Sequence, residues 1–215
     1  MTSPHGTILF DLDGTLTDNQ VGIFRCIHHA MRELGMPLDP SLDLRWCVGP
    51  PLQHSLAKLA GNNPELGFKA LEIYREEYGK TGMFENRLYD GIMESLAILQ
   101  PSFSLYVATS KLESYAQRIA EHFNMDRYFN RVYGSKSDGT HSDKSELIAY
   151  LLKVEKPPAP LYMVGDREHD MIGALRNKVT PIGVTWGFGT EKELRQAGAK
   201  TIVHLPSELP EAFSA

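Results

Sequence analysis

The chain has 215 residues, of which 42% are hydrophobic and 23% are charged. These fractions are typical of a globular protein with one or two domains, and they exclude disordered and fibrous chains. The 22 Lys and Arg residues stand against 27 Asp and Glu residues, so the formal net charge is −5. A mildly acidic chain lacks the positive surface that binds phosphate backbones. We therefore expect neither nucleic acid nor a membrane surface as a partner.

The two cysteines, Cys26 and Cys47, are too few for a disulfide framework and are not spaced for a structural zinc site. Free thiols suit a reducing compartment, and the N-terminal segment lacks the basic and apolar regions of a signal peptide. No apolar run approaches the length of a membrane span. We therefore expect a cytoplasmic protein, and a monomer, because no feature of the sequence signals a dimer.

The first part of the chain predicts one strand followed by helices. Residues 7–10 are a short apolar run, which predicts a buried strand. A helix is expected to begin at Asp18, because apolar side chains recur there at helical spacing. The pattern stays helical from 41 to 83, and no strand is predicted between 17 and 83.

After Gly91 the pattern changes, and predicted helices alternate with predicted strands. The strands are expected at 104–109, 131–133, 161–164, 181–185 and 201–204, and the helices at 92–99, 113–122, 144–154, 170–177 and 192–197. This alternation predicts an α/β fold in which helices cover both faces of a parallel sheet. The expected domains are an α/β core, 1–16 with 84–215, and an all-helical insertion, 17–83.

Polar residues follow the predicted strands, at the sheet edge where ligands of such folds bind. They are Asp11, Asp13, Thr109, Asp166 and Asp170, with Lys144 at the start of the helix before strand 161–164. Clustered carboxylates repel one another, and a divalent cation removes that cost. Oxygen ligands without nitrogen or sulfur favour Mg²⁺, and the lysine favours an anionic substrate such as a phosphoryl group.

The segment Asp11–Thr15 resembles motif I of the haloacid dehalogenase superfamily. Thr109, Lys144 and the segment 165–170 match its motifs II, III and IV in the same order. The helical segment 17–83 resembles the small C1 cap of the phosphoglycolate phosphatase-like branch. The resemblance covers essentially the whole chain, and it implies a Rossmann-like core with the cap inserted after the first strand.

The resemblance also implies a role for each matching residue. Asp11 would be the nucleophile that forms an aspartyl-phosphate, and Asp13 the acid and base. Asp11, the backbone carbonyl of Asp13 and Asp166 would hold Mg²⁺, and Asp170 would ligate through water or orient the other ligands. The expected phosphate-binding residues are Gly14, Thr109, Ser110 and Lys144.

The details of the motifs favour hydrolysis of a phosphate ester. The dehalogenase and phosphonate-hydrolysing branches lack an acid matching Asp13, and the sugar-phosphomutase branch usually has Val at the position of Thr15. Segments 48–52 and 82–86 resemble 5′-nucleotidase-like members, so a nucleoside 5′-monophosphate is the first expected substrate. Phosphoglycolate phosphatase, a broad-specificity small-molecule phosphatase and, in another class, a non-catalytic sensor of phosphorylated metabolites are the alternatives.

Two further expectations concern specificity, and a third concerns a glycine-containing loop. In C1-capped relatives the cap supplies contacts to the leaving group, and the candidates here are Arg45, Gly49 and Gln53. Arg167 stands where the family commonly has Ser or Thr, a departure that leaves the exact substrate open. The segment 187–189 lacks the third glycine of a nucleotide-binding loop and is expected to be a turn.

Overall fold

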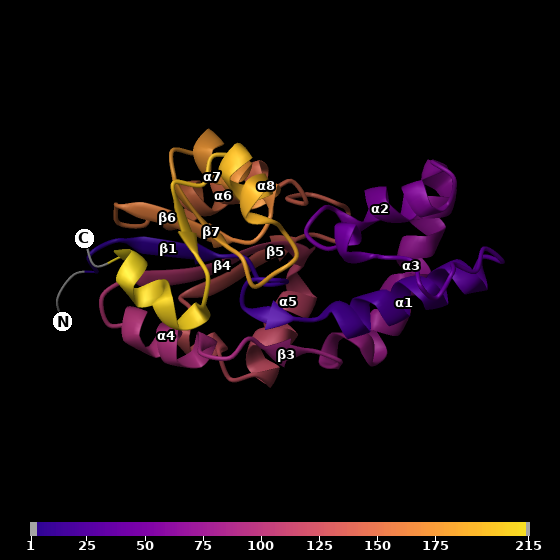
Figure 1. Ribbon diagram of the computed structural model, residues 1–215, viewed down its shortest axis with the longest axis horizontal. Coiled ribbons are helices and arrows are strands. Elements are labelled where there is room, and N and C mark those ends of the chain that lie inside the picture. Colours follow the sequence, from indigo (N-terminus) through magenta and orange to yellow (C-terminus); the bar gives the residue numbers. More distant parts are fainter. Residues whose placement is uncertain (1–3, 214–215) are drawn as a thin grey trace. The chain divides into compact units, whose positions relative to one another are not determined.

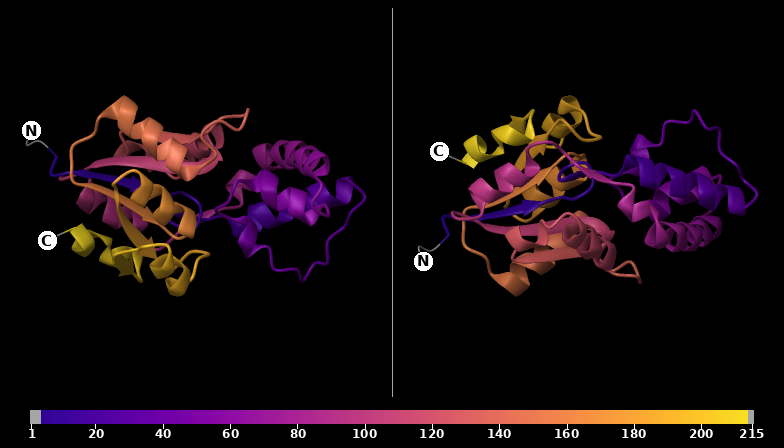
Figure 2. Two further views of the ribbon diagram at one scale, coloured as in Figure 1. Left: turned by 90° about the horizontal axis from the view of Figure 1, so that it is seen from above. Right: turned by 90° about the horizontal axis from the view of Figure 1, so that it is seen from below.

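The computed structural model describes residues 4–213, which divide into two compact units (Figures 1 and 2). The core unit comprises the described residues up to Asp18 and those from Leu88 onward, and the helical unit comprises Asn19–Arg87. The domain boundaries expected from the sequence, 17–83 within 1–16 and 84–215, stay a prediction.

The core unit contains a parallel sheet of six strands, with the order β5-β4-β1-β6-β7-β8. The strands are β1 (Thr7–Phe10), β4 (Ser104–Leu112), β5 (Arg131–Ser135), β6 (Leu161–Gly165), β7 (Thr180–Val184) and β8 (Thr201–Val203). All four residues of β1 are buried, as its uninterrupted apolar sequence predicts for a central strand. The predicted α/β fold class is confirmed.

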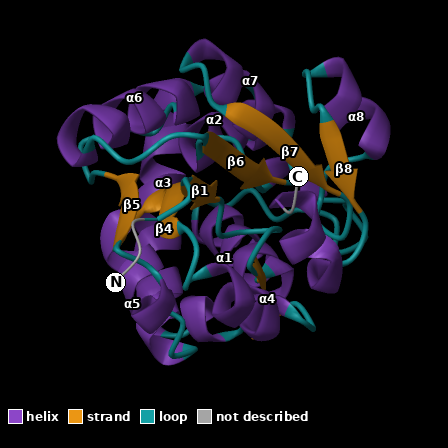
Figure 3. Cartoon of the chain, turned by 90° about the vertical axis from the view of Figure 1, so that its left-hand side faces the viewer, coloured by secondary structure: helices purple, strands orange, loops and turns teal. Residues whose placement is uncertain are grey.

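Helices cover both faces of this sheet, as Figure 3 shows with α6 and α7 on one side and α4 and α5 on the other. Their bounds are α4 (Ile92–Leu99), α5 (Glu113–His122), α6 (Lys144–Glu155), α7 (Glu168–Arg176) and α8 (Glu191–Gln196). Side chains of β1, β4, β5 and β6, among them Leu9 and Met163, form one apolar cluster with Leu147, Ile148 and Leu151 of α6. With this cluster on one face and helices over both, the central strands are buried, which leaves their ends for polar chemistry.

Asp143 explains where α6 begins. Its side-chain oxygen Oδ1 accepts hydrogen bonds from the backbone amides of Ser145 and Glu146, at 2.8 and 3.1 Å. These bonds satisfy two amides that have no partner inside the helix, so the aspartate acts as an N-cap. Lys144 thereby becomes the first residue of the helix and is held at the carboxyl edge of the sheet.

The helical unit contains α1 (Gln20–Glu33), α2 (Leu52–Leu59) and α3 (Pro64–Lys80), with short 3-10 helices η1 (Arg45–Cys47) and η2 (Gly82–Phe84). A Cβ on Gly67 would lie 2.6 Å from Cα of Ala57, so this glycine lets α3 pack closely on α2. Arg25 of α1 also donates hydrogen bonds to Glu77 of α3 and to Glu85. Figure 2 shows these helices from two sides, coloured from indigo to magenta.

Two short strands, β2 (Thr17–Asp18) and β3 (Arg87–Leu88), pair with each other where the chain leaves and re-enters the core unit. The expectation of no strand between 17 and 83 was therefore wrong at β2. A two-residue strand has no alternating apolar pattern, and its partner lies about seventy residues away, so local sequence carries no signal for it.

Several element bounds differ from the predicted ones. Helix α1 begins at Gln20 rather than Asp18, because Asp18 belongs to β2. Helix α7 begins at Glu168, and β4 continues three residues beyond 109. The 3-10 helix η4 (Pro206–Phe213) was not predicted. Across the part of the chain that the structure describes, no helix combines the length and the apolar character that crossing a membrane requires.

Candidate active site

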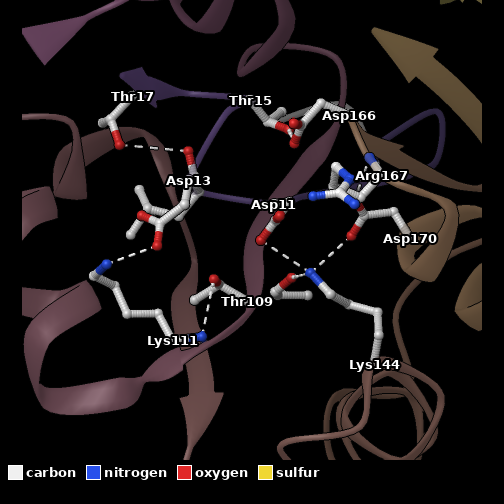
Figure 4. A network of polar contacts seen from close by, with 12 residues as sticks. Asp11, Asp13, Thr15, Thr17, Thr109, Lys111, Lys144, Asp166, Arg167 and Asp170 are labelled. Atoms are coloured by element: carbon white, nitrogen blue, oxygen red, sulfur yellow. Dashed lines mark hydrogen bonds and ion pairs between the residues drawn. The ribbon is translucent and has the colours of Figure 1, made fainter. Parts of the chain in front are cut away.

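The strand register brings the predicted site residues to one edge of the sheet. Phe10, the last residue of β1, lies beside Val107 of β4 and Val164 of β6. Asp11 directly follows Phe10, while Thr109 and Asp166 lie two residues beyond those partners. Figure 4 shows all three side chains in one polar network at this edge. The central parallel strands therefore bring three motifs that are far apart in the sequence to one edge of the sheet.

Three carboxylates form the centre of the site. Asp11, Asp166 and Asp170 each place one oxygen within 4.8 Å of the oxygens of the other two. All three side chains are buried. A Cβ on Gly165 would overlap the Asp170 carboxylate at 2.2 Å, so the glycine that ends β6 makes room for this residue. The arrangement concentrates negative charge where water is excluded.

Lys144 supplies the positive charge inside this cluster. Its Nζ lies 2.9 Å from Oδ1 of Asp11 and 2.8 Å from Oδ1 of Asp170. It also donates a hydrogen bond of 2.8 Å to the backbone carbonyl of Ala108. Nζ of Lys144 therefore contacts three oxygens, one through a hydrogen bond and two through ion pairs. Lys144 thus ties β1, β4 and α7 together through one atom.

The pKa values follow from this balance of charges. Burial, and then repulsion by Asp170 and Asp11, raise the pKa of Asp166 well above its ordinary value. Burial also raises the pKa of Asp170, although Lys144 opposes the shift. Burial alone would lower the pKa of Lys144, but attraction to Asp11 and Asp170 outweighs it and raises that pKa. One ammonium therefore does not compensate three carboxylates.

Asp166 is held by two donors that the sequence analysis did not identify. The hydroxyl of Thr15 donates to Oδ1 at 3.1 Å, and the backbone amide of Phe188 donates to Oδ2 at 2.8 Å. The indole Nε1 of Trp186 in turn donates to the carbonyl of Thr15 at 2.9 Å. The carboxylate is therefore fixed from both of its oxygens.

Glycines on two segments allow this close approach to Asp166. A Cβ on Gly14 or Gly187 would lie 2.4 or 2.5 Å from its Oδ2, and a Cβ on Gly189 would lie 1.9 Å from its backbone oxygen. Gly14 also has a φ of +87°, which favours glycine. The segment 187–189, expected only as a turn, is packed against Asp166. The pair of glycines that flanks Phe188 after a strand was the available signal.

Asp13 belongs to a different charge pair. Its Oδ2 lies 2.6 Å from Nζ of Lys111, a residue of β4 to which the sequence analysis gave no role. The backbone amide of Lys111 donates to Oγ1 of Thr109 at 3.3 Å. Thr109 itself is buried, with 2% of its surface exposed. The carboxylate of Asp13 is therefore separate from the acidic triad, and a metal contact through its carbonyl stays a prediction.

The amide of Gly14 donates to the carbonyl of Thr17 at 2.8 Å, which closes the turn after β1. A phosphate contact through this amide would have to replace that bond. A phosphate contact through the ammonium of Lys144 would likewise have to replace one of the three contacts of that ammonium. Ser110 is half-buried on β4 beside Thr109. The phosphate-binding roles of Gly14, Thr109, Ser110 and Lys144 stay predictions.

The remaining predicted residues lie in other contacts. Arg45 is exposed on η1 and pairs with Asp43 at 2.8 Å, Gly49 has a φ of +102°, and Gln53 is exposed on α2. All three belong to the helical unit, and their substrate contacts stay predictions. Arg167 donates from Nε to Glu193 of α8 at 2.9 Å, which ties the start of α7 to that helix.

The acidic triad fits a divalent cation. Its donors are carboxylate oxygens, which hard cations prefer, and one oxygen of each residue lies within 4.8 Å of those of the other two. Burial and the charges of Asp170 and Asp11 raise the pKa of Asp166, so the protein compensates its charge only in part. A cation between these oxygens would supply that compensation. A carboxylate placed like that of Asp11, directly after the end of a strand, could also act as a nucleophile.

Comparisons with known proteins agree with this geometry. The family model described as haloacid dehalogenase-like hydrolase matches residues 8–184. A 5′-nucleotidase from Pseudomonas aeruginosa is 46% identical over 190 residues, which are 87% of this chain and 86% of the relative. Tyrosine-protein kinase PtkA from Mycobacterium tuberculosis is 37% identical over 212 residues, which are 96% of this chain and 72% of that protein.

A solved structure gives the same result for the fold. The crystal structure of a predicted phosphatase from Clostridium acetobutylicum has a TM-score of 0.92 and 39% identity, and the match covers 98% of both chains. The expectations of an enzyme, of a phosphatase-type hydrolase and of this superfamily are thereby confirmed. The chain belongs to the haloacid dehalogenase-like hydrolase family.

Proposed function

We propose that this protein is a Mg²⁺-dependent phosphomonoester hydrolase that acts through an aspartyl-phosphate on Asp11. The observation that carries the proposal is the buried triad of Asp11, Asp166 and Asp170, in which Asp11 and Asp170 pair with the ammonium of Lys144. Uncompensated carboxylates at a strand edge suit an Mg²⁺ site, and Asp11 is the member that directly follows the central strand. When bound, Mg²⁺ would supply charge neutralisation for the phosphoryl oxygens.

Asp11 would attack phosphorus in line with the leaving oxygen. Lys144 contacts Oδ1 of Asp11 and would hold the carboxylate in place while its other oxygen, Oδ2, attacks. As the bond from Asp11 to phosphorus forms, the bond to the leaving oxygen breaks. Fixed charges that need no rearrangement at that moment lower the barrier.

Asp13 would serve as the acid and then the base. It would donate a proton to the leaving oxygen in the first step and take one from the attacking water in the second. Its carboxylate is 13% exposed and separate from the triad, which suits a group that must exchange protons. The hydroxyl of Thr109 accepts from the amide of Lys111 and would donate its own hydrogen to a phosphoryl oxygen.

The proposed substrate is a small phosphorylated metabolite, with a nucleoside 5′-monophosphate as the first choice. It is supported by the segments 48–52 and 82–86 and by the 46% identity to the relative named 5′-nucleotidase. Phosphoglycolate phosphatase and a broad-specificity phosphatase remain the alternatives for the same chemistry. The proposal includes a monomer in the cytoplasm, with no nucleic acid and no membrane as partner.

Hydrolysis of 4-nitrophenyl phosphate with and without Mg²⁺ tests the proposal. We expect Mg²⁺-dependent turnover by the wild type and none by Asp11→Asn, with unchanged thermal unfolding of the variant as a control for folding. Rapid quenching followed by borohydride reduction should convert residue 11, and no other aspartate, to homoserine. Turnover by Asp11→Asn would refute the mechanism.

A panel of phosphate esters then identifies the substrate. Phosphate release from nucleoside 5′-monophosphates, sugar phosphates, phosphoglycolate and a phosphotyrosine peptide should be greatest for the nucleotides. Tight binding of a phosphorylated metabolite without turnover of any ester would instead favour the non-catalytic sensor. Transfer of label from γ-labelled ATP to a tyrosine would indicate the activity that the name of the relative PtkA states.

A further inference from the structure

Lys111 forms a partly buried ion pair that the proposed function leaves unexplained. Its Nζ lies 2.6 Å from Oδ2 of Asp13, and the two side chains are only 7% and 13% exposed. The pair joins residues 98 positions apart, from the end of β4 to the segment after β1. Burying a lysine beside the carboxylate of the proposed acid has a desolvation cost that a surface pair does not have.

The backbone of β4 places Lys111 at this point. The strand continues beyond Thr109 to Leu112, and its register against β5 shifts between Ala108 and Leu112. Within this irregular stretch the backbone amide of Lys111 donates a hydrogen bond to the hydroxyl of Thr109. Figure 4 shows Lys111 reaching Asp13 from the segment that also carries Thr109. The hydroxyl of Thr109, which we propose binds phosphate, and the ion pair of Asp13 are therefore positioned by one segment of β4.

We propose that Lys111 is a positioning residue that orients Asp13 for proton exchange with the leaving oxygen. The proposal rests on the proposed phosphatase function. Lys111 binds Oδ2, and we assign the exchange of the proton to Oδ1. In the first step the proton passes from Oδ1 to the leaving oxygen as that oxygen separates from phosphorus. In the second, Oδ1 takes a proton from water as the water oxygen displaces Asp11, and Lys111 neither gains nor loses a proton.

The dependence of the rate on the leaving group separates this role from a structural one. Across substituted phenyl phosphates, 4-nitrophenolate leaves without protonation, whereas unsubstituted phenolate depends more on the acid. A displacement of about 1 Å in a positioned catalytic group costs about 10²-fold in rate. We expect Lys111→Met to lower kcat/KM by about that factor for phenyl phosphate, and far less for 4-nitrophenyl phosphate.

Three further variants complete the experiment. Asp13→Asn should show the same steepened dependence on the leaving group, and adding Lys111→Met to it should cause no further loss, because the lysine acts through the aspartate. Lys111→Arg keeps the positive charge and should recover part of the activity. Lys136→Met is the matched control, because Lys136 also pairs with a carboxylate, Glu113, at 2.6 Å, but is 43% exposed.

Each outcome decides the inference. An equal loss for all leaving groups, or an additional loss on top of Asp13→Asn, would overturn it, since Lys111 would then act on the phosphoryl group or on folding. Thermal unfolding of each variant separates those two causes. If the wild type hydrolyses neither the phenyl phosphates nor any ester of the substrate panel, the proposed function itself fails. Turnover by the wild type with a uniform loss in Lys111→Met removes only the positioning role.

Discussion

Replacing Asp166 with Asn is expected to stabilise the metal-free protein while abolishing its response to Mg²⁺. The Asp166 carboxylate is fully buried, and its oxygens lie within 4.8 Å of those of Asp11 and Asp170. An amide in the same place keeps the hydrogen bonds: its oxygen accepts from the amide of Phe188, and its NH₂ donates to the hydroxyl of Thr15, which accepts instead of donating. The substitution therefore removes the charge and little else.

The magnitude follows from Coulomb's law. Two like charges 4.8 Å apart repel by about 3 kcal/mol at an effective dielectric constant of about 20. Asp166 has two such neighbours, and attraction to Arg167 opposes their repulsion, so we take one of the two repulsions as the net cost. A gain of about 3 kcal/mol in the free energy of unfolding remains, which for a chain of this size raises Tm by about 6–12 °C.

The stabilisation by Asp166→Asn should increase with pH. The pKa of Asp166 is raised in the folded protein, so the folded state keeps a proton that the unfolded state has lost. The stability of the wild type therefore falls as the pH rises from the ordinary pKa of an aspartate, about 4, toward the raised pKa of Asp166. Below the ordinary pKa the carboxyl is protonated in both states, and its charge costs no stability. The advantage of Asp166→Asn should be large at about pH 8 and small at about pH 4.

Differential scanning calorimetry in EDTA, and again in Mg²⁺, measures both effects. Asp138→Asn is the control, because hydrogen bonds from Thr140 lower the pKa of that exposed carboxyl and the substitution should give no stabilisation. A lower Tm of Asp166→Asn in EDTA at high pH would refute the reasoning. An increase of Tm by Mg²⁺ equal to that of the wild type would refute the role of Asp166 as a ligand.

Three other predictions concern the same site. Because burial and like charges raise the pKa of Asp166, Mg²⁺ must displace protons, so its affinity should fall as the pH falls and calorimetry in buffers of different ionisation enthalpy should detect proton release. Gly189→Ala places a Cβ 1.9 Å from the backbone oxygen of Asp166, so isothermal titration should show weaker Mg²⁺ binding, and unchanged affinity would contradict the packing described. Lys144→Met removes the ammonium that pairs with the buried carboxylates of Asp11 and Asp170, and it should lower the free energy of unfolding in EDTA by about 3–5 kcal/mol. Mg²⁺ should restore part of this loss, and equal losses with and without Mg²⁺ would show that charge is not the cause.

The elements with strong local patterns could be predicted from the sequence. The run 7–10 became β1 and the segments 92–99 and 113–122 became α4 and α5 with the expected bounds, because apolar spacing determines which face packs. β2 could not be predicted, since its two residues form a strand only by pairing with β3. Local pattern thus determines the long elements, and tertiary pairing determines the short ones.

The candidate site divides in the same way. Asp11, Asp166, Asp170 and Lys144 were expected together because each follows a strand or begins a helix at one sheet edge, and the structure brings them together. Lys111 was missed because its role depends on how far β4 continues beyond Thr109. Its position directly after the strand-end residues Thr109 and Ser110 was a usable signal. The amide of Phe188 was missed because a backbone donor has no side-chain signature.

The central claim is that Asp11, Asp166 and Asp170 hold one divalent cation and that Asp11 receives the phosphoryl group. Crystals grown with Mn²⁺ and beryllium fluoride test both parts in one anomalous diffraction experiment. We predict a manganese peak bonded to oxygens of Asp11 and Asp166, with Asp170 in direct or water-mediated contact, and trifluoroberyllate attached to the remaining oxygen of Asp11. A manganese peak elsewhere, or beryllium fluoride bound away from Asp11, would contradict the claim.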